Sequence, residues 1–171
     1  MEGSDLKLKH KDRNVKRHNG FTMLEMMIVV VLVGILATIA VPTFVRTIPR
    51  LKTRAEARNA LNLMRTARSR AISENTQYGV YFNISGRTYV LFKDTVSPSS
   101  ATYNVGDSLM SNPISVDPNA VYTGCTLTGN CIVFLASGAA SQSGTLTIST
   151  ADGSQTYSIS VLAATGKTKL Q

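Results

Sequence analysis

One apolar stretch near the N-terminus constrains this chain more than any other feature. The sixteen residues from Met26 to Val41 include a single polar side chain, Thr38. Extended to residues 21–45, the segment would be roughly 37 Å long as an α-helix, which is enough to cross a bilayer. A chain of 171 residues with such a segment has room for one ordinary domain beyond it.

The residue types on which many enzymes depend are scarce. The only histidines are His10 and His18, and the only cysteines are Cys125 and Cys131. Without its N-terminal tail the chain has no histidine, and therefore no candidate for histidine acid–base catalysis, a histidine-activated nucleophile or a Cys/His zinc site. We expect no catalytic residues, no metal and no cofactor, and thus a protein that is not an enzyme.

The tail before the apolar segment is basic. Residues 1–19 carry six Lys and Arg against three acidic side chains and have little apolar content. This layout is typical of a targeting or membrane-insertion element. An ordinary signal peptide is one interpretation, because residues 38–40 resemble a weak cleavage site. The apolar core is longer than in most signal peptides, however, and Glu25 stands near its start.

Glu25 allows two interpretations. An ionised carboxylate within an apolar helix is costly unless it lies shallow in the bilayer or has a cationic partner. In the first interpretation Glu25 lies at headgroup depth and needs no partner. In the second it requires a specific cation nearby.

The residues around Glu25 resemble a known signal. The sequence Gly-Phe-Thr-Met-Leu-Glu at residues 20–25, after a basic tail and before an apolar helix, resembles the type III signal of type IV pilins and pseudopilins. The resemblance implies that a prepilin peptidase cuts between Gly20 and Phe21 and methylates the new terminus. It also implies that Glu25 pairs with the terminal amine of a neighbouring subunit and that Pro42 perturbs the helix. Basic residues flank both ends of the segment, so it is the resemblance that places residues 46–171 outside the inner membrane.

The pattern beyond the membrane segment is first helical and then β. Over residues 46–74, apolar side chains at spacings of three and four predict an amphipathic continuation of the same helix: Ala57, Ala60, Leu61, Met64, Ala67 and Ala71. Residues 75–171 are expected to form an antiparallel β domain with three hairpins, over residues 78–92, 121–135 and 145–162. The polar residues 95–120 predict a long, mobile loop. The expected fold class is α+β and pilin-like, with a long N-terminal helix packed on the β domain.

Charge is concentrated on the amphipathic half of the helix. Residues 46–70 hold eight basic side chains and one acidic one, whereas residues 71–171 hold four basic and five acidic ones. The basic ridge is either a solvated face near anionic lipid headgroups or a docking edge for acidic subunits or nucleic acid.

The two cysteines flank the turn of the second expected hairpin. Outside the inner membrane the compartment is oxidising, so Cys125 and Cys131 on opposite arms of a hairpin are expected to form a disulfide. Two buried free thiols are the alternative.

The C-terminal part resembles the GspH/FimT family of minor pseudopilins. The resemblance rests on Phe134 followed by Gly138, on residues 144–148 and 159–161, and on the Gly-basic ending at residues 166–169. The chain departs from the family by lacking the proline that often stands between Phe134 and Gly138. It also reads Gly-Lys-Thr-Lys where the family ends in Gly-Arg-x-Arg.

This resemblance implies one of two functions. The first is a minor pseudopilin that helps initiate or cap the pseudopilus of a type II secretion system, with a cleaved leader at residues 1–20 and a single pass through the inner membrane. Its partners would be prepilin peptidase, other minor and major pseudopilins and the inner-membrane assembly platform. The alternative is a FimT-like minor type IV pilin that assembles pili or takes up DNA. Lys167 and Lys169 would then contact phosphates, without the bidentate fork of arginine.

Overall fold

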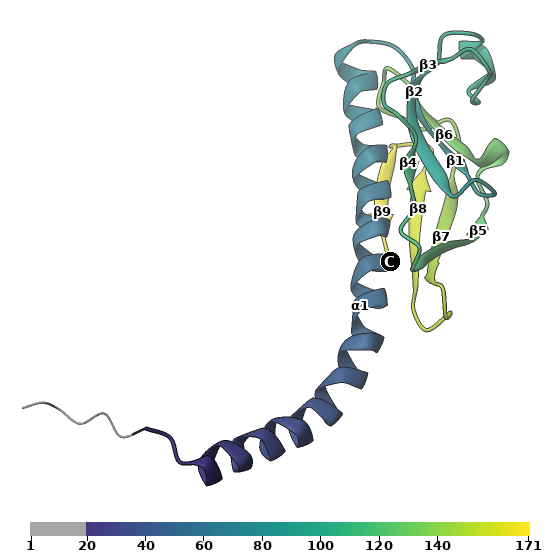
Figure 1. The fold of residues 1–171 in the computed structure, drawn as a ribbon. Helices are drawn as coiled ribbons and strands as arrows, with labels where there is room; N and C mark the ends of the chain where they lie inside the picture. The colour runs from purple at the N-terminus through teal and green to yellow at the C-terminus, as the bar shows by residue number, and fades with distance from the viewer. Residues whose placement is uncertain (1–19) are drawn as a thin grey trace, which may run out of the picture. The chain divides into compact units, whose positions relative to one another are not determined.

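The computed structural model describes residues 20–171. The basic tail, and with it nearly all of the expected leader, lies outside the described residues. The chain divides into two compact units, residues 1–41 and residues 42–171. The helix α1 (Met23–Ser73) contributes to both units and is followed by nine strands (Figure 1).

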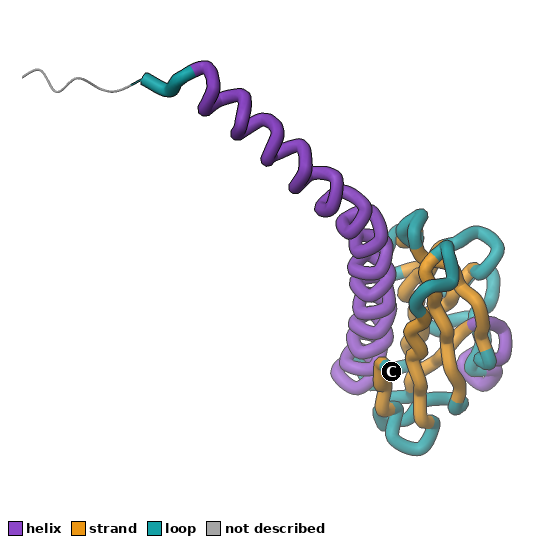
Figure 2. The backbone as a smooth tube through the Cα atoms, turned by 90° about the horizontal axis from the view of Figure 1, so that it is seen from below, coloured by secondary structure: helices purple, strands orange, loops and turns teal. Residues whose placement is uncertain are grey.

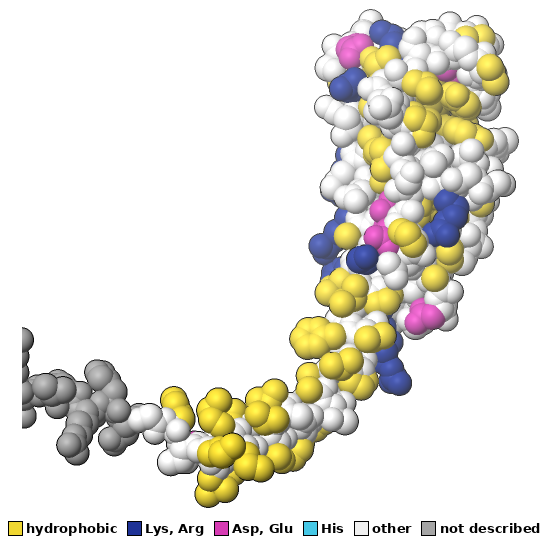
Figure 3. Space-filling model, viewed as in Figure 1, with side chains coloured by type: hydrophobic (Ala, Val, Ile, Leu, Met, Phe, Trp, Pro, Cys, Tyr) yellow, Lys and Arg dark blue, Asp and Glu magenta, His cyan; other side chains and the backbone are white. Residues whose placement is uncertain are grey.

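The first unit contains the apolar part of α1. Every side chain from residue 20 to residue 48 is exposed, and the most apolar window has a mean hydropathy of 2.7 with none of it buried. Apolar side chains accordingly cover this part of the helix in the space-filling view (Figure 3). By length and composition the helix can span a membrane, as the sequence predicts.

Two prolines lie inside α1. Proline lacks the N–H that would donate to the preceding turn, so it weakens a helix interior. The helix nevertheless continues through both Pro42 and Pro49. The expected perturbation at Pro42 therefore does not end the helix, and Pro42 is the first residue of the second unit.

In the second unit the rest of α1 lies beside two antiparallel sheets (Figure 2). The five-stranded sheet has the order β3-β2-β1-β6, with β4 also paired to β2. Its strands are β1 (Tyr78–Asn83), β2 (Thr88–Lys93), β3 (Ser108–Leu109), β4 (Ile114–Ser115) and β6 (Cys131–Phe134). The four-stranded sheet has the order β5-β7-β8-β9. Its strands are β5 (Ala120–Cys125), β7 (Gly144–Thr150), β8 (Thr156–Leu162) and β9 (Lys167–Leu170).

One hydrophobic cluster joins the helix to both sheets. The apolar stripe expected on α1 is confirmed, since all six of its residues are buried. They pack with Val80 and Phe82 of the first sheet and with Leu146 and Ile148 of the second. Thr53 extends the buried stripe and donates from Oγ1 to the Asn119 carbonyl oxygen at 3.1 Å, which ties the helix to the start of β5.

Two of the three expected hairpins are confirmed. Strands β1 and β2 pair, as do β7 and β8. The second expected hairpin is wrong, because β5 pairs with β7 whereas β6 pairs with β1. A short 3-10 turn, η2 (Thr128–Asn130), carries the chain from one sheet to the other. The turn residues therefore mark a change of direction, but they do not determine which strands become neighbours.

The segment 95–120 is also more ordered than expected. It contains the 3-10 turn η1 (Pro98–Ser100), and both β3 and β4 pair with β2. Asp107 is buried and accepts three backbone N–H groups, from Thr95, Val96 and Asn104. These bonds hold the segment together where its composition predicts a mobile loop.

The changed strand pairing also affects the cysteines. Cys125 and Cys131 are free thiols rather than the expected disulfide. They lie on strands of different sheets, and they pack against different clusters: Cys131 belongs to a small cluster with Phe92 and Val133, whereas Cys125 packs against the main core. Burial raises the pKa of both thiols, which lowers the fraction of reactive thiolate.

We expect a thiol reagent to label the native protein slowly and to label two cysteines per chain once the protein is unfolded without reductant. The slow native reaction follows from burial and raised pKa values. Mass spectrometry of the labelled protein measures both states. An unfolded chain with no labelled cysteine would instead establish the disulfide.

Candidate assembly and anion-binding sites

The N-terminus of α1 positions Glu25. Thr22 precedes the helix, and its Oγ1 accepts the Glu25 backbone N–H at 3.2 Å. A threonine followed by a glutamate three residues later is the capping-box pattern, and the partial positive charge of a helix start stabilises the carboxylate. Our sequence analysis missed this role, although the Thr-x-x-Glu spacing that signals it stands in the sequence. Gly20, Phe21 and Glu25 are all exposed.

No cation of the described chain lies within salt-bridge distance of Glu25, because the two ion pairs of residues 20–171 are Lys52–Asp117 and Lys93–Glu74. The carboxylate is therefore free to meet a cation from outside the described chain.

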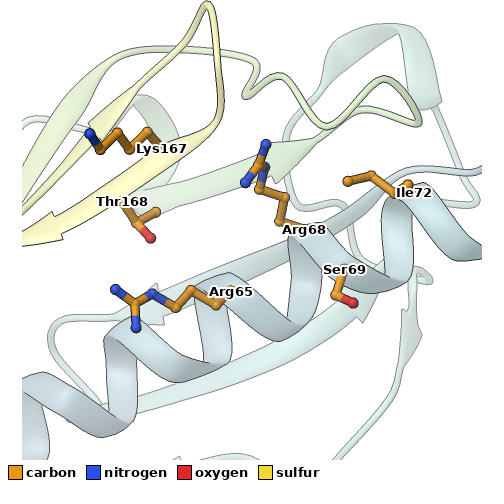
Figure 4. Close-up of a pocket in the computed structure, with 6 residues that line it drawn as sticks. All are labelled: Arg65, Arg68, Ser69, Ile72, Lys167 and Thr168. Carbon is orange, nitrogen blue, oxygen red and sulfur yellow. The ribbon is translucent and has the colours of Figure 1, made fainter.

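A second candidate site is a basic groove between α1 and β9 (Figure 4). Its volume is about 500 Å³, and no acidic side chain lines it. The groove is lined by Arg65, Arg68, Ser69, Ile72, Lys167 and Thr168. Three cations thus face one cavity, which favours an anionic ligand.

Two glycines allow the chain segments beside the groove to pack closely. Gly138 and Gly166 both have positive φ, 81° and 61°, where residues with a side chain are strained. A Cβ at Gly166 would overlap the Gly138 carbonyl oxygen and would lie 3.0 Å from Nε of Arg68. That Nε donates to the same carbonyl oxygen at 2.8 Å. Gly138 and Gly166, both part of the family signature, therefore pack directly against each other, and this contact positions Arg68.

The sequence analysis treats Lys167 and Lys169 as a pair, but only one of them lines the basic groove. Both lie on the exposed face of β9, with the buried Thr168 between them. Lys167 lines the basic groove, whereas Lys169 does not. The two lysines share a second hollow of about 260 Å³ with residues 160–162.

Sequence reasoning also missed Arg65 and Arg68 as partners of Lys167. The first four arginines of the expected basic ridge on residues 46–70 stand four residues apart and are exposed on α1, away from the groove: Arg46, Arg50, Arg54 and Arg58. Which arginines meet β9 depends on how the strand packs against the helix, and no local pattern records this.

Two tyrosines packed in the main core, Tyr89 and Tyr122, have raised pKa values. Burial, followed by the negative charge of Glu56, raises the pKa of Tyr89 well above its usual range. The pKa of Tyr122 is raised mainly by burial as well. Both phenols therefore stay protonated at neutral pH. Within residues 20–171, no group of three or more His, Cys, Asp or Glu side chains is arranged to hold a metal ion.

Comparisons with solved structures agree with this architecture. The minor pseudopilin EpsH from the type 2 secretion system of Vibrio cholerae superposes with a TM-score of 0.56 and 15% identity, over 70% of this chain and 96% of that one. The type IV minor pilin FimU of Pseudomonas aeruginosa PAO1 gives a TM-score of 0.52 and 16% identity, over 71% of this chain and 90% of that one. At these identities the likeness establishes a pilin-like fold.

A relative matches by sequence over part of its length. The type IV major pilin protein PilA of Myxococcus xanthus DK1622 is 41% identical over 70 residues, which is 41% of this chain and 31% of that protein. The match therefore spans under a third of that relative.

Two family matches cover most of the chain. Residues 15–41 match the prokaryotic N-terminal methylation motif, which marks the chain for prepilin peptidase processing and for assembly with pilin-like subunits. Residues 56–165, well over half of the chain, match the family described as type II transport protein GspH. The chain therefore belongs to the GspH family of pilin-like proteins.

Proposed function

We propose that the protein is a minor pseudopilin, a structural subunit that helps to initiate or cap the periplasmic pseudopilus of a type II secretion system. The observation that carries this proposal is the fully exposed apolar part of α1, attached to a β domain of the GspH family. So large an apolar surface requires lipid before assembly and other helices after it. In this proposal the protein is not an enzyme, and its mechanism is assembly.

Glu25 sets the register of that assembly. After cleavage between Gly20 and Phe21, the new amine would carry a positive charge next to an apolar helix. A neighbouring subunit that brings its Glu25 to this amine neutralises both charges, whereas a misregistered subunit leaves a carboxylate unpaired among apolar side chains. The capping contact from Thr22 supports the pairing by holding the first turn in place.

The remaining partners and the topology follow from the same proposal. The leader would lie in the cytoplasm and residues 46–171 in the periplasm, with one pass through the inner membrane. Prepilin peptidase, other minor and major pseudopilins and the assembly platform are the proposed partners.

A second candidate function is DNA binding by a minor type IV pilin. The observation that favours it is the basic groove, where Lys167 is joined by Arg65 and Arg68 with no acid in the lining. Against it, residues 71–171 are slightly acidic in sum, and lysine binds phosphate as a point charge.

The first prediction from this proposal concerns processing. We expect intact-mass spectrometry of membrane-extracted protein to show loss of residues 1–20 and one added methyl group at Phe21. The Gly20→Val variant, which blocks the proposed cleavage position, should keep the leader. A mature N-terminus at Val41 would contradict the proposal and indicate ordinary signal peptidase cleavage.

The second prediction separates the two roles of Glu25. Glu25→Ala should leave cleavage and membrane insertion intact but strongly reduce incorporation into filaments, because the neighbouring amine loses its carboxylate. The matched control is Thr22→Ala, which removes the capping oxygen at a cost of about 1 kcal/mol of helix stability and keeps the carboxylate. Immunoblots of sheared filaments measure incorporation. Normal assembly of Glu25→Ala would refute the register role.

The third prediction separates the two candidate functions. In gel-shift titrations with detergent-solubilised protein, we expect weak duplex binding that disappears by about 0.15 M salt. The groove variant Arg65→Ala with Lys167→Ala and the ridge control Arg54→Ala with Arg58→Ala should weaken binding equally, since each removes two positive charges. Tight binding that survives salt and is lost in the groove variant alone would establish the DNA-binding alternative.

A further inference from the structure

The face of the five-stranded sheet that points away from α1 is covered by a separate segment, residues 95–107. Side chains alternate along β2, so Leu91 belongs to the main core and Phe92 to the small cluster on the opposite face. Residues 95–107 lie over this opposite face. Tyr103 stacks on Tyr81 with ring centroids 4.5 Å apart and meets the Phe92 ring edge-on at 5.1 Å.

Asp107 forms hydrogen bonds to other residues of this covering segment. Its Oδ1 accepts the N–H groups of Thr95 and Val96, each at 3.0 Å, and its Oδ2 accepts that of Asn104 at 2.7 Å. Because Thr95 directly follows Asp94, the Asp107 carboxylate lies beside the Asp94 peptide. The Asp107 charge also acts on the Asp94 carboxylate, so the two carboxylates lie near one another at the start of the segment.

Asp94 has an unusual environment. Asp94 is 2% exposed. The backbone N–H of Ser97 lies near its carboxylate, but neither carboxylate oxygen makes a hydrogen bond of normal distance and angle. The backbone N–H of Asp94 donates to the Gln77 carbonyl oxygen at 3.0 Å, which continues the register of Tyr78 with Lys93. Asp94 and Gln77 are therefore opposite one another on the same face, and Gln77 Oε1 is also buried without a partner.

Residues 20–171 supply no cation that forms an ion pair with Asp94 or Asp107. Lys93 alternates to the other face of β2 and is paired with Glu74 at 3.4 Å. A buried carboxylate without a partner is strongly unfavourable as an anion, and burial together with the charge of Asp107 raises the pKa of Asp94. Asp94 therefore either holds a proton or meets a cation that binds oxygen ligands.

We propose that Asp94, Asp107 and the amide oxygen of Gln77 bind a calcium ion beneath residues 95–107. Calcium is a hard cation that takes carboxylate, amide, backbone carbonyl and water oxygens, so two carboxylates suffice when amide and backbone oxygens complete the shell. The ion would hold the covering segment on the sheet and so determine the surface that this side of the domain presents. The site is independent of the basic groove and of the proposed function.

Terbium luminescence tests the site in the full-length, detergent-solubilised protein. Tb³⁺ replaces Ca²⁺ and is excited by nearby tyrosines, and this chain has no tryptophan to complicate the signal. We expect Tb³⁺ emission that Ca²⁺ abolishes at millimolar concentration and that Mg²⁺ leaves largely unchanged. Asp94→Asn should lose the emission, whereas the exposed-turn control Asp152→Asn should keep it. Absence of Ca²⁺-displaceable emission in the wild-type protein would overturn the proposal.

Thermal unfolding gives a second readout. A ligand that binds the folded state raises its melting temperature, so we expect Tm in excess Ca²⁺ to exceed Tm in EDTA by about 4 °C or more. Asp94→Asn should melt at the same temperature in both solutions. Its cooperative transition in EDTA also shows that it folds. A Ca²⁺ shift of equal size in wild type and Asp94→Asn would assign the binding to another place and overturn the proposal.

Discussion

Close packing of one helix face against two sheets is the contact on which the rest of the domain depends. Alanine supplies half of the buried residues of α1, and Leu61 and Met64 are the largest apolar ones. Small side chains let the helix backbone approach the strands closely, and the larger aromatic residues of the sheets fill the space between them. The same cluster contains residues of both sheets, so the two sheets are held together through the helix as well as through their own contacts.

This packing also creates the basic groove. A buried stripe on one side of a helix leaves its flanking residues at the edge of the contact, and Arg65 and Arg68 flank the buried Met64 and Ala67. Strand β9 then brings Lys167 to the same edge. The junction of Gly138 with Gly166 allows this approach, because any side chain at Gly166 would displace the carbonyl oxygen to which Arg68 donates. The glycines and the arginine therefore form one structural unit.

The helix α1 is continuous, but its two parts have different patterns of burial. In the second unit the helix buries a narrow stripe against the sheets and exposes charged residues. Between residues 20 and 48 all its side chains are exposed and most are apolar. The first part therefore depends for its stability on lipid or on other helices, which is the physical basis of a subunit that is complete only within an assembly.

The long helix, its buried stripe, two hairpins and the methylation motif could be predicted from the sequence, because they depend on local periodicity and on residues close together in the chain. The sheet that receives β6 depends instead on long-range strand pairing, and so does the packing of Cys125 and Cys131 in separate clusters. The same arrangement brings Lys167 rather than Lys169 to Arg65 and Arg68, and places Asp107 beside the backbone that follows Asp94. These outcomes depend on strand pairing between segments distant in the sequence. Local pattern does not encode such pairing, because many partners bury a short apolar strand equally well.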